Sequence, residues 1–402
     1  PKYHARDVAR KRMEQRKGLV VLGSATPSLE AYAAGQRKII KLVKISQRYN
    51  QKALPAVEIV DMKKELAQGN KSMFSYLLRS KLAERVERGE QSILFLNRRG
   101  YSTFVFCREC GYVASCPNCD VSLTYHSQKQ LLCCHYCGFR QDVFHNCPEC
   151  GSRYIRFYGQ GTQKVEEETA ALFPGVEVLR LDTDSAAEKH REILDRFRRQ
   201  EAPILVGTQM LSKGLDFPNV TLVGVISADQ LLNMPDFRSR ERAFQLLTQV
   251  AGRAGRADKP GEVIIQTYSP DDRAILQAAR HDYDRFFWEE IAYRKERGYP
   301  PFAHIIRIMV YHEKEDRVIR AAQVLTDCIR RVKEAESEVC RVLGPAPAVM
   351  TKLKNQFRWQ VSVKGKSPEI LRRIIHKGVK DFYSESSSSG INLSIEVNPL
   401  NI

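Results

Sequence analysis

The sequence predicts an α/β protein in which a doubly wound parallel sheet carries a cysteine-rich insertion and is followed by a smaller α+β domain. Three observations predict this fold class. Short apolar runs alternate with helical or loop segments through most of the chain before residue 270. Eight of the eleven cysteines fall within residues 107–150. After Pro300-Pro301 a new series of strand and helix signals begins, and 402 residues are enough for several domains of roughly 100–200 residues.

The charge of the chain favours a polyanionic partner. The formal net charge is +17, from 64 Lys and Arg against 47 Asp and Glu, and the pI is near 9.4. Nucleic acid is the first expectation and an anionic membrane surface the second. No window of about 18 apolar residues and no secretory signal occur, so we expect a soluble, cytoplasmic protein without a membrane segment. Because the chain opens on Pro1, just before a helical pattern over residues 5–16, we expect a further N-terminal part.

The first part of the chain has the pattern of parallel strands that end in loops. The apolar run at residues 18–22 leads into Gly23-Ser24-Ala25-Thr26-Pro27-Ser28, as a buried strand leads into a loop at its carboxyl end. Ser28 is expected to cap a helix. The same design predicts further strands at Ser92–Leu96, Gly175–Leu179, Ile204–Gly207, Val220–Ile226 and Glu262–Thr267. Helical connections such as residues 187–199 separate them, which indicates a doubly wound parallel sheet.

The insertion carries four Cys-x2-Cys pairs. They are Cys107 and Cys110, Cys116 and Cys119, Cys134 and Cys137, and Cys147 and Cys150. Eight thiolates can fill two tetrahedral zinc sites, and Cys-x2-Cys is the usual chelating spacing. A disulfide framework is the alternative, but a reducing compartment argues against it. With sulfur at every position we expect two structural Zn²⁺ ions.

Two ways of sharing the metals remain open from the spacing, sequential pairing and nested pairing. The two ends of the insertion must return to one domain, so we favour the nested arrangement. Zinc 1 then takes Cys107, Cys110, Cys147 and Cys150, and zinc 2 takes Cys116, Cys119, Cys134 and Cys137. Cys133 is a less regular substitute for Cys134. His126, His135 and His145 are expected as polar surface groups or as neighbours of the ligands, not as ligands themselves.

The C-terminal part predicts a ferredoxin-like α+β domain. Pro300-Pro301 ends a long amphipathic stretch and marks the boundary. The signals beyond it read strand, helix, strand, strand, helix, strand, at 305–311, 316–335, 339–342, 357–363, 368–383 and 391–397. Lys352, Lys354, Arg358 and Trp359 combine cations with an aromatic ring, which suits a single-stranded base. A strand with Phe357 and Trp359 in the core is the equal alternative.

Two further segments indicate phosphate chemistry. Residues 249–256 place Arg253 and Arg256 three positions apart behind a small-residue turn. Residues 207–218 follow an apolar strand, where open sheets bind ligands. A basic glycine-rich turn is the plain alternative for the arginine segment alone. Together with residues 23–28, these segments occur in the order of motifs III, V and VI of superfamily 2 helicases.

Over essentially all 402 residues the chain resembles the family of primosomal protein N′, bacterial replication-restart helicases. The resemblance rests on these motifs, on the eight-cysteine insert, and on five shorter segments: Tyr3–Asp7, Phe95–Tyr101, Gly159–Gln163, Leu343–Pro347 and Arg358–Gln360. It implies a RecA-like helicase lobe and an ATP-dependent 3′ to 5′ DNA helicase that needs Mg²⁺. It also implies binding of stalled or branched forks and loading of the replicative helicase.

The resemblance further implies roles for individual residues. Arg253 and Arg256 would stabilise the transferring phosphoryl group, and Gln249 would orient their helix. Gly214 and Asp216 would contact the nucleotide, and Ser24 and Thr26 would couple hydrolysis to movement. The expected contacts to the DNA backbone are Thr208, Gln209, Gly161 and Thr162, and to single-stranded DNA Arg358 and Trp359. Arg358 and Gln360 are the candidates for the acidic C-terminal tail of single-stranded-DNA-binding protein.

The resemblance also sets expectations for the organisation of the chain. Residues 1–72 would end the first helicase lobe. Residues 73–106 with 151–298 would form the second lobe, 107–150 the zinc insertion and 299–402 the C-terminal domain. The family's phosphate loop and acidic box lie N-terminal to Tyr3, so this chain alone is expected to be inactive. We expect a monomer that meets other primosome proteins. The alternative for this chain by itself is a non-catalytic zinc scaffold that binds nucleic acid or proteins.

Overall fold

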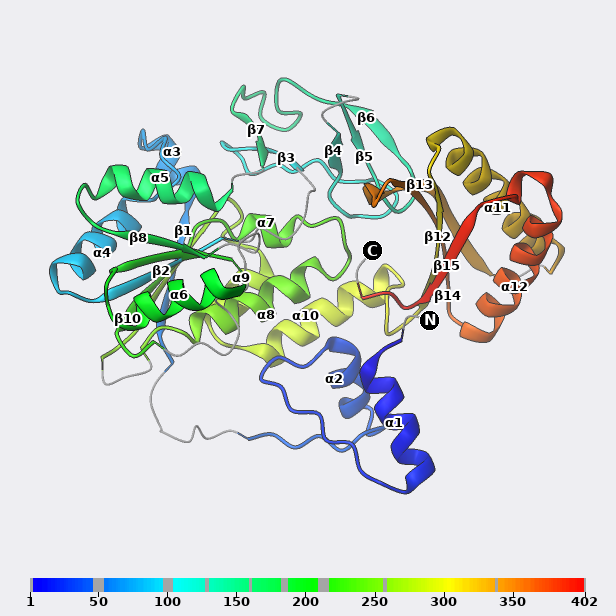
Figure 1. The fold of residues 1–402 in the computed structure, drawn as a ribbon, viewed down its shortest axis with the longest axis horizontal. Coiled ribbons are helices and arrows are strands. Elements are labelled where there is room, and N and C mark those ends of the chain that lie inside the picture. Colours follow the sequence, from blue (N-terminus) through cyan, green and yellow to red (C-terminus); the bar gives the residue numbers. More distant parts are fainter. Residues whose placement is uncertain are drawn as a thin grey trace. The chain divides into compact units, whose positions relative to one another are not determined.

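The computed structural model describes most of the chain in two compact units. The described residues are 3–45, 54–96, 104–126, 130–158, 161–181, 187–208, 217–255, 259–336 and 339–400. The first unit comprises Pro1–Val43, His135–Gly138 and Ile291–Ile402, and the second comprises Lys44–Cys134 and Phe139–Glu290. Figure 1 labels their elements. None of the helices in the described ranges is both long and apolar enough to cross a membrane.

The second unit is built on a six-stranded parallel sheet. Its order is β1-β11-β10-β2-β9-β8, and every neighbouring pair is parallel. The strands are β1 (Ala56–Asp61), β2 (Gln91–Phe95), β8 (Val178–Leu181), β9 (Ile204–Gly207), β10 (Val220–Val225) and β11 (Glu262–Thr267). Strands β2, β9 and β10 are buried along their whole length, as central strands covered on both faces must be.

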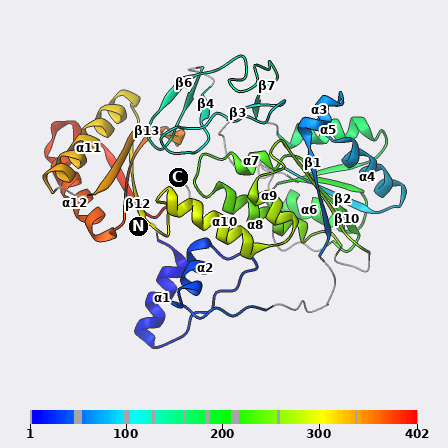
Figure 2. The same cartoon turned by 180° about the vertical axis from the view of Figure 1, so that it is seen from behind.

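Helices cover both faces of this sheet, as a doubly wound fold requires (Figure 2). Helix α4 (Tyr76–Glu87) and helix α5 (Thr162–Leu172) contribute Leu78, Leu82 and Val165 to a core with Leu94, Val206 and Leu222. The remaining helices of the unit are α3 (Met62–Ala67), α6 (Ala187–Arg198), α7 (Asp229–Leu232), α8 (Ser239–Ala251), α9 (Arg273–Ala279) and α10 (Tyr283–Glu296), which runs on into the first unit.

The cysteine-rich insertion forms two small antiparallel sheets. Strands β3 (Phe104–Cys107) and β7 (Ile155–Tyr158) pair where the insertion leaves and rejoins the second unit. Between them, β4 (Thr124–His126), β5 (Leu131–Cys133) and β6 (Arg140–Asp142) make a three-stranded sheet. The two ends of the insertion are therefore held together by a strand pair.

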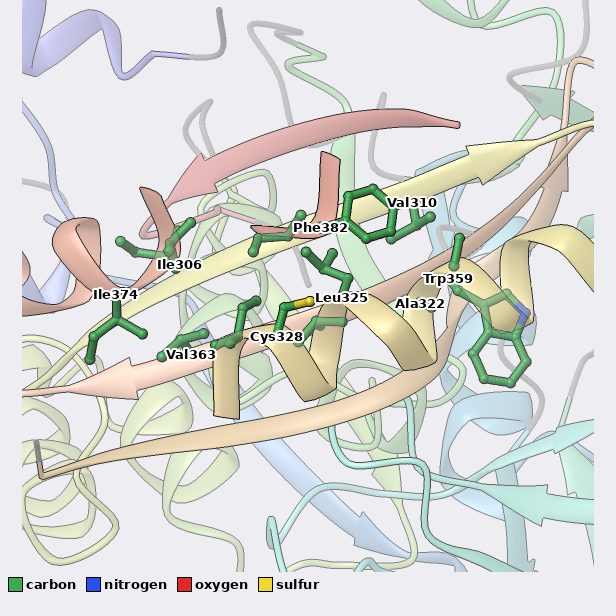
Figure 3. Close-up of a cluster of buried hydrophobic side chains, with 14 of the residues drawn as sticks. Ile306, Val310, Ala322, Leu325, Cys328, Trp359, Val363, Ile374 and Phe382 are labelled. Carbon is green, nitrogen blue, oxygen red and sulfur yellow. The ribbon is translucent and has the colours of Figure 1, made fainter. Parts of the chain in front are cut away.

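The C-terminal part has the predicted strand and helix order, and its sheet is antiparallel in the order β13-β14-β12-β15. Its elements are β12 (His304–His312), α11 (Glu315–Ala335), β13 (Cys340–Leu353), β14 (Gln356–Gly365), α12 (Pro368–Ser384), the short η2 (Ser386–Ser388) and β15 (Asn392–Val397). Figure 3 shows Leu325 and Cys328 of α11 packed among the strand residues Val310 and Val363. The domain thus has a core of its own.

The predicted strand at residues 18–22 is wrong. These residues follow α1 (Ala5–Arg16) as a segment without regular secondary structure that pairs with no strand of the described chain. Leu19 and Val21 are 82% and 81% exposed. A parallel strand needs a neighbour for its backbone groups, and an apolar run alone does not supply one. The predicted cap is present, because the Ser28 side chain accepts the Ala31 N–H at the start of α2 (Leu29–Gln36).

Two smaller differences concern the parallel sheet. The strand expected at residues 175–179 is β8, which begins three residues later, because Gly175 adopts φ +81° in the preceding turn. The edge strand β1 was not predicted, because its half-exposed pattern lacks the continuous apolar run of a central strand.

Candidate functional site

The first group of thiols joins the two ends of the insertion. The sulfurs of Cys107, Cys110, Cys147 and Cys150 all lie within 4.8 Å of one another. The Cys107 and Cys150 sulfurs are 3.7 Å apart, and the Cys110 and Cys147 sulfurs are 3.5 Å apart. Zinc with sulfur ligands at about 2.3 Å would place those sulfurs roughly 3.8 Å apart, so the group fits a tetrahedral Zn²⁺.

The second group of thiols comes from the interior of the insertion. Cys116, Cys119, Cys134 and Cys137 also lie within 4.8 Å of one another. Three of them are buried, and Cys137 is half-buried. The structure therefore brings the eight thiols together in the nested arrangement, with the first and last pairs in one group and the middle pairs in the other.

The knuckle backbones explain why each pair of sulfurs converges. Gly111 and Gly151 donate their N–H groups to the carbonyls of Cys107 and Cys147, and both glycines have positive φ angles, +83° and +72°. A turn of this kind favours glycine. Burial, aided by hydrogen bonds from neighbouring thiols, raises the pKa of Cys110 to about 12. A divalent cation reverses that preference, because it binds and stabilises the thiolate.

The remaining cysteine and the histidines of the insertion stand outside both groups. The sulfur of Cys133 contacts the Cys134 carbonyl at 3.7 Å, and His145 is exposed. His135 is fully buried, and its Nδ1 lies 2.7 Å from the carbonyl oxygen of Pro347.

The segment expected to meet nucleotide follows helix α8. Gln249 is an exposed residue of this helix, and Arg253 lies half-buried just after it. The N–H of Gly255 donates to the carbonyl of Val220 on β10. Gly255 has φ +67°, and a Cβ there would lie 2.4 Å from the nitrogen of Gly261, so only glycine fits. Arg256, Gly214, Asp216 and Gln209 lie outside the described residues.

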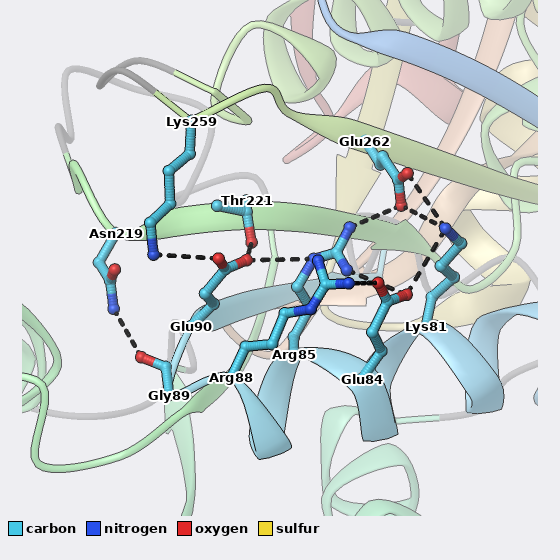
Figure 4. Close-up of polar contacts among 10 residues, drawn as sticks. All are labelled: Lys81, Glu84, Arg85, Arg88, Gly89, Glu90, Asn219, Thr221, Lys259 and Glu262. Carbon is cyan, nitrogen blue, oxygen red and sulfur yellow. Dashed lines mark hydrogen bonds and ion pairs between the residues drawn. The ribbon is translucent and has the colours of Figure 1, made fainter.

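A buried carboxylate anchors the turn that follows this segment (Figure 4). Glu90 accepts hydrogen bonds from the Thr221 hydroxyl at 2.6 Å and from the Lys259 ammonium at 3.0 Å. Arg85 approaches the same carboxylate at 3.4 Å and also binds Glu262. Burial alone would raise the pKa of Glu90, but the hydrogen bonds from Thr221 and Lys259 lower it below its usual value. The sequence offered no motif for this network, which joins three elements.

Two predicted backbone-contact segments lie at the ends of elements of the second unit. Thr208 follows β9, is 2% exposed, and its hydroxyl has no hydrogen-bond partner among the described residues. Gly161 is the N-cap position of α5, and Thr162 is the buried first residue of that helix. In the first unit, the Ser24 hydroxyl accepts the N–H of Thr26, and Thr26 is 8% exposed.

The structure corrects two expectations for the C-terminal domain. Trp359 is 7% exposed and packs in the core drawn in Figure 3, so it does not offer a face to a base. Gln360 is 1% exposed, and its side-chain amide donates to the carbonyl of His135, so it is not available to a partner. The two side chains point to opposite faces of β14, and each face is covered: Trp359 packs in the buried cluster with α11, and Gln360 contacts His135 of the insertion. Arg358 is half-buried, whereas Lys352 and Lys354 are exposed.

Three family profiles match successive parts of the chain. Residues 116–141 match the PriA DNA helicase Cys-rich region domain, and residues 147–258 match the helicase conserved C-terminal domain. Residues 295–400 match the primosomal protein N C-terminal domain. The profiles follow the order of the cysteine insertion, the parallel sheet and the antiparallel sheet.

Curated relatives match over nearly the whole chain. The replication restart protein PriA of Bacillus subtilis (strain 168) is 47% identical over 401 residues, which are 99% of this chain and 49% of that protein. The PriA of Synechocystis is 44% identical over 418 aligned residues, covering 100% of this chain and 49% of that protein. The PriA of Haemophilus influenzae is 35% identical over 402 aligned residues, which are 99% of this chain and 54% of that protein.

The chain spans about half the length of these curated relatives. Within that span the three matched profiles and the two four-cysteine groups agree with one another. The chain therefore belongs to the family of the replication restart protein PriA.

Proposed function

We propose that this chain supplies the second RecA-like lobe, the zinc module and the C-terminal domain of an ATP-dependent 3′ to 5′ DNA helicase of replication restart. The protein would bind stalled or branched forks and promote primosome assembly and loading of the replicative helicase. The observation that carries this proposal is the arginine segment after α8, which lies within the part of the chain that matches a helicase profile and whose Gly255 donates to Val220 of β10. The relatives are named replication restart proteins, which points the same way.

For the nucleotide, Arg253 and Arg256 would stabilise charge on the transferring phosphoryl group of ATP bound with Mg²⁺. Gln249 lies in the last turn of α8, just before Arg253, and would orient the arginine segment. Gly214 and Asp216 would contact the nucleotide. The hydrogen bond from Lys259 to Glu90 supports a fixed backbone close to Arg253.

The sugar–phosphate backbone of the DNA would contact four residues. Thr208 and Gln209 follow β9, and Gly161 and Thr162 stand at the start of α5. The Thr208 hydroxyl, which has no hydrogen-bond partner within the described ranges, and the net charge of +17 support an anionic ligand. Ser24 and Thr26 would couple nucleotide hydrolysis to movement. Single-stranded-DNA-binding protein would present its acidic tail to Arg358, the predicted contact that is still partly accessible.

For the architecture, we propose the boundaries expected from the sequence, with residues 1–72 as the end of the first lobe. Residues 73–106 and 151–298 would form the second lobe, 107–150 the zinc insertion and 299–402 the C-terminal domain. Each four-thiol group would hold one structural Zn²⁺, since four sulfurs leave no open position for water. The protein would work as a monomer with other primosome proteins.

A second candidate applies to this chain by itself, a zinc scaffold that binds nucleic acid or proteins without catalysis. The closed four-sulfur groups favour it, because neither offers a catalytic position. One experiment separates the two. The intact protein that contains this chain should unwind forked DNA with ATP, and the 402-residue chain should bind DNA without hydrolysing ATP. An intact protein that binds forks but neither unwinds them nor hydrolyses ATP would leave only the scaffold.

A further inference from the structure

A cavity of about 470 Å³ opens at the carboxyl edge of the parallel sheet, inside the second unit. Its wall includes the residues that directly follow three strands, Met62 after β1, Ile226 after β10 and Tyr268 after β11. The base of the cysteine insertion, at β3 and β7, forms another part of the wall. Ligands of open α/β sheets bind at this edge.

Four cations line the cavity. Lys71, Arg156 and Lys164 are exposed, and each comes from a different segment of the chain. Arg108 is 8% exposed, and its Nε donates to the Tyr268 hydroxyl at 2.8 Å, so its guanidinium is held in the wall. Four positive groups from separated segments create a field that attracts an anion.

Two carboxyl groups also line the cavity, but both have nearby partners. The carboxylate of Asp229 accepts the N–H of Tyr268 and the hydroxyl of Thr267, at 3.0 and 3.1 Å. Glu168 lies 3.9 Å from Lys164, one helical turn earlier on α5. The lining therefore keeps an excess of positive charge, with Lys71, Arg156 and Lys164 as its exposed cations.

An exposed aromatic ring lies beside these cations. Phe157 is 47% exposed although it belongs to a strand. Its ring contacts the ring of Tyr125, and the two ring centroids are 4.5 Å apart. Exposed rings next to cations are the usual composition of surfaces that bind single-stranded nucleic acid, where a base stacks on the ring. Gly161, at the N-terminus of α5, also lines the cavity, and the positive end of a helix favours a phosphate.

We propose that this cavity holds one nucleotide of single-stranded nucleic acid, with its phosphate at Lys71, Arg156 and Lys164 and its base against Phe157. This inference rests on the proposed function and deepens it, because it adds a nucleotide-sized site to the backbone contacts at Gly161 and Thr162. A cavity of this volume lies within the range of small-ligand sites. A base in a duplex is paired and stacked, so single strands should bind better than duplex.

The test measures binding of the zinc-loaded 402-residue chain to a labelled single strand and to a blunt duplex. Arg156→Glu and Lys71→Glu should each weaken single-strand binding roughly tenfold and lower the salt slope by about 1 to 2. Phe157→Leu, which keeps bulk but removes the ring, should weaken it about fivefold or more. The matched controls are Arg153→Glu and Tyr154→Leu, an exposed cation and an exposed ring of the neighbouring segment that do not line the cavity.

The outcomes separate the inference from the function on which it rests. If the wild-type chain binds single strands but Arg156→Glu weakens binding no more than Arg153→Glu, the cavity is not the site and the proposed function is untouched. If the wild-type chain binds single strand and duplex with equal affinity, the proposal that the cavity holds an unpaired nucleotide is overturned. Absence of all DNA binding overturns both. Arg156 is on β7, next to the cysteine insertion, so Arg156→Glu could lose zinc or fail to fold. Lys71 lies far from the insertion in the sequence, so Lys71→Glu still tests the cavity in that case.

Discussion

The side-chain amide of Gln360 on β14 donates a hydrogen bond to the backbone carbonyl of His135. His135 lies between Cys134 and Cys137 of the second thiol group. Gln360 and His135 are both almost completely buried. The ring of His135 reaches the carbonyl of Pro347 on β13, and a Cβ on Gly138 would lie 2.8 Å from the carbonyl of Pro345. A cysteine knuckle therefore packs closely against the antiparallel sheet of the C-terminal domain.

Removing this amide should destabilise the first unit. Gln360→Ala leaves a buried carbonyl without its donor, which costs about 1–3 kcal/mol. Chemical denaturation monitored by far-ultraviolet circular dichroism measures the loss. Gln356→Ala, at the half-buried start of the same strand, is the matched control and should cost less. Equal losses for the two variants would mean that the contact with His135 contributes nothing specific.

Metal analysis should find two zinc ions per chain, because eight thiols form two groups of four. Cys107→Ser and Cys147→Ser should deplete the same ion, and Cys116→Ser should deplete the other. If Cys107→Ser and Cys119→Ser instead deplete one shared ion, the grouping in the structure is wrong. Both ions should be released as the pH falls, because protons compete with the metal for the thiolates.

Arg253 should be needed for hydrolysis but not for binding. In the intact protein, Arg253→Ala should lower ATP turnover by about 10³- to 10⁵-fold, the contribution of an arginine finger, while fork binding is largely retained. DNA-stimulated phosphate release and a fork-binding titration measure the two. Arg198→Ala, an exposed arginine on α6, is the control and should hydrolyse ATP normally. Near-normal turnover of Arg253→Ala would remove its proposed role.

Glu90 should stabilise the second unit through the turn after the arginine segment. Glu90→Gln weakens the charged hydrogen bonds from Lys259 and Arg85, and we expect a loss of about 1–3 kcal/mol near neutral pH. The pKa of Glu90 is lowered in the folded protein, so this stabilisation is present above the ordinary carboxyl pKa and is lost as the pH falls through the folded value.

Urea unfolding of wild type and Glu90→Gln across this pH range, with zinc content followed in parallel, measures the effect. The difference between the two proteins should shrink toward acid pH. Thr221→Val is the control, because it removes a neutral donor to the same carboxylate and should cost less. A difference that is independent of pH would show that the carboxylate charge is not what stabilises the turn.

The sequence predicted the elements whose pattern is local. The C-terminal strands and helices followed from their periodicity, and the thiol groups followed from four regular Cys-x2-Cys pairs and the need to return the insertion to one domain. The strand at residues 18–22 failed because strand formation depends on a neighbour, which an apolar run does not encode. From the sequence Trp359 fitted a ligand contact and a core position equally, and its packing in the buried cluster of the folded domain decides for the core.

The rest of the candidate site depends on residues that are distant along the chain. Glu90 meets Lys259 across 169 positions, and Arg108 meets Tyr268 across 160. No motif marks either pair, because each contact arises from the order of strands in the sheet. The cavity likewise combines Lys71, Arg156 and Lys164, which no spacing in the sequence connects.

Arg358 lies on β14 opposite Tyr311 of β12 and should contribute to binding an acidic peptide. With Trp359 and Gln360 buried, Arg358 is the predicted partner contact that an acidic peptide could still reach, near the exposed Lys352 and Lys354. Arg358→Glu should weaken binding of an acidic C-terminal peptide roughly tenfold, and the remaining binding should depend less on salt, because one ion pair becomes a repulsion.

Fluorescence anisotropy of the labelled peptide with the 402-residue chain, at low and moderate salt, makes the measurement. Arg372→Glu reverses an exposed charge on α12 of the same domain and is the matched control. Neither change should alter the unfolding transition, since neither residue belongs to the buried core. If both variants bind the peptide equally, the attraction is a property of the overall positive charge, and Arg358 has no specific role in binding an acidic tail.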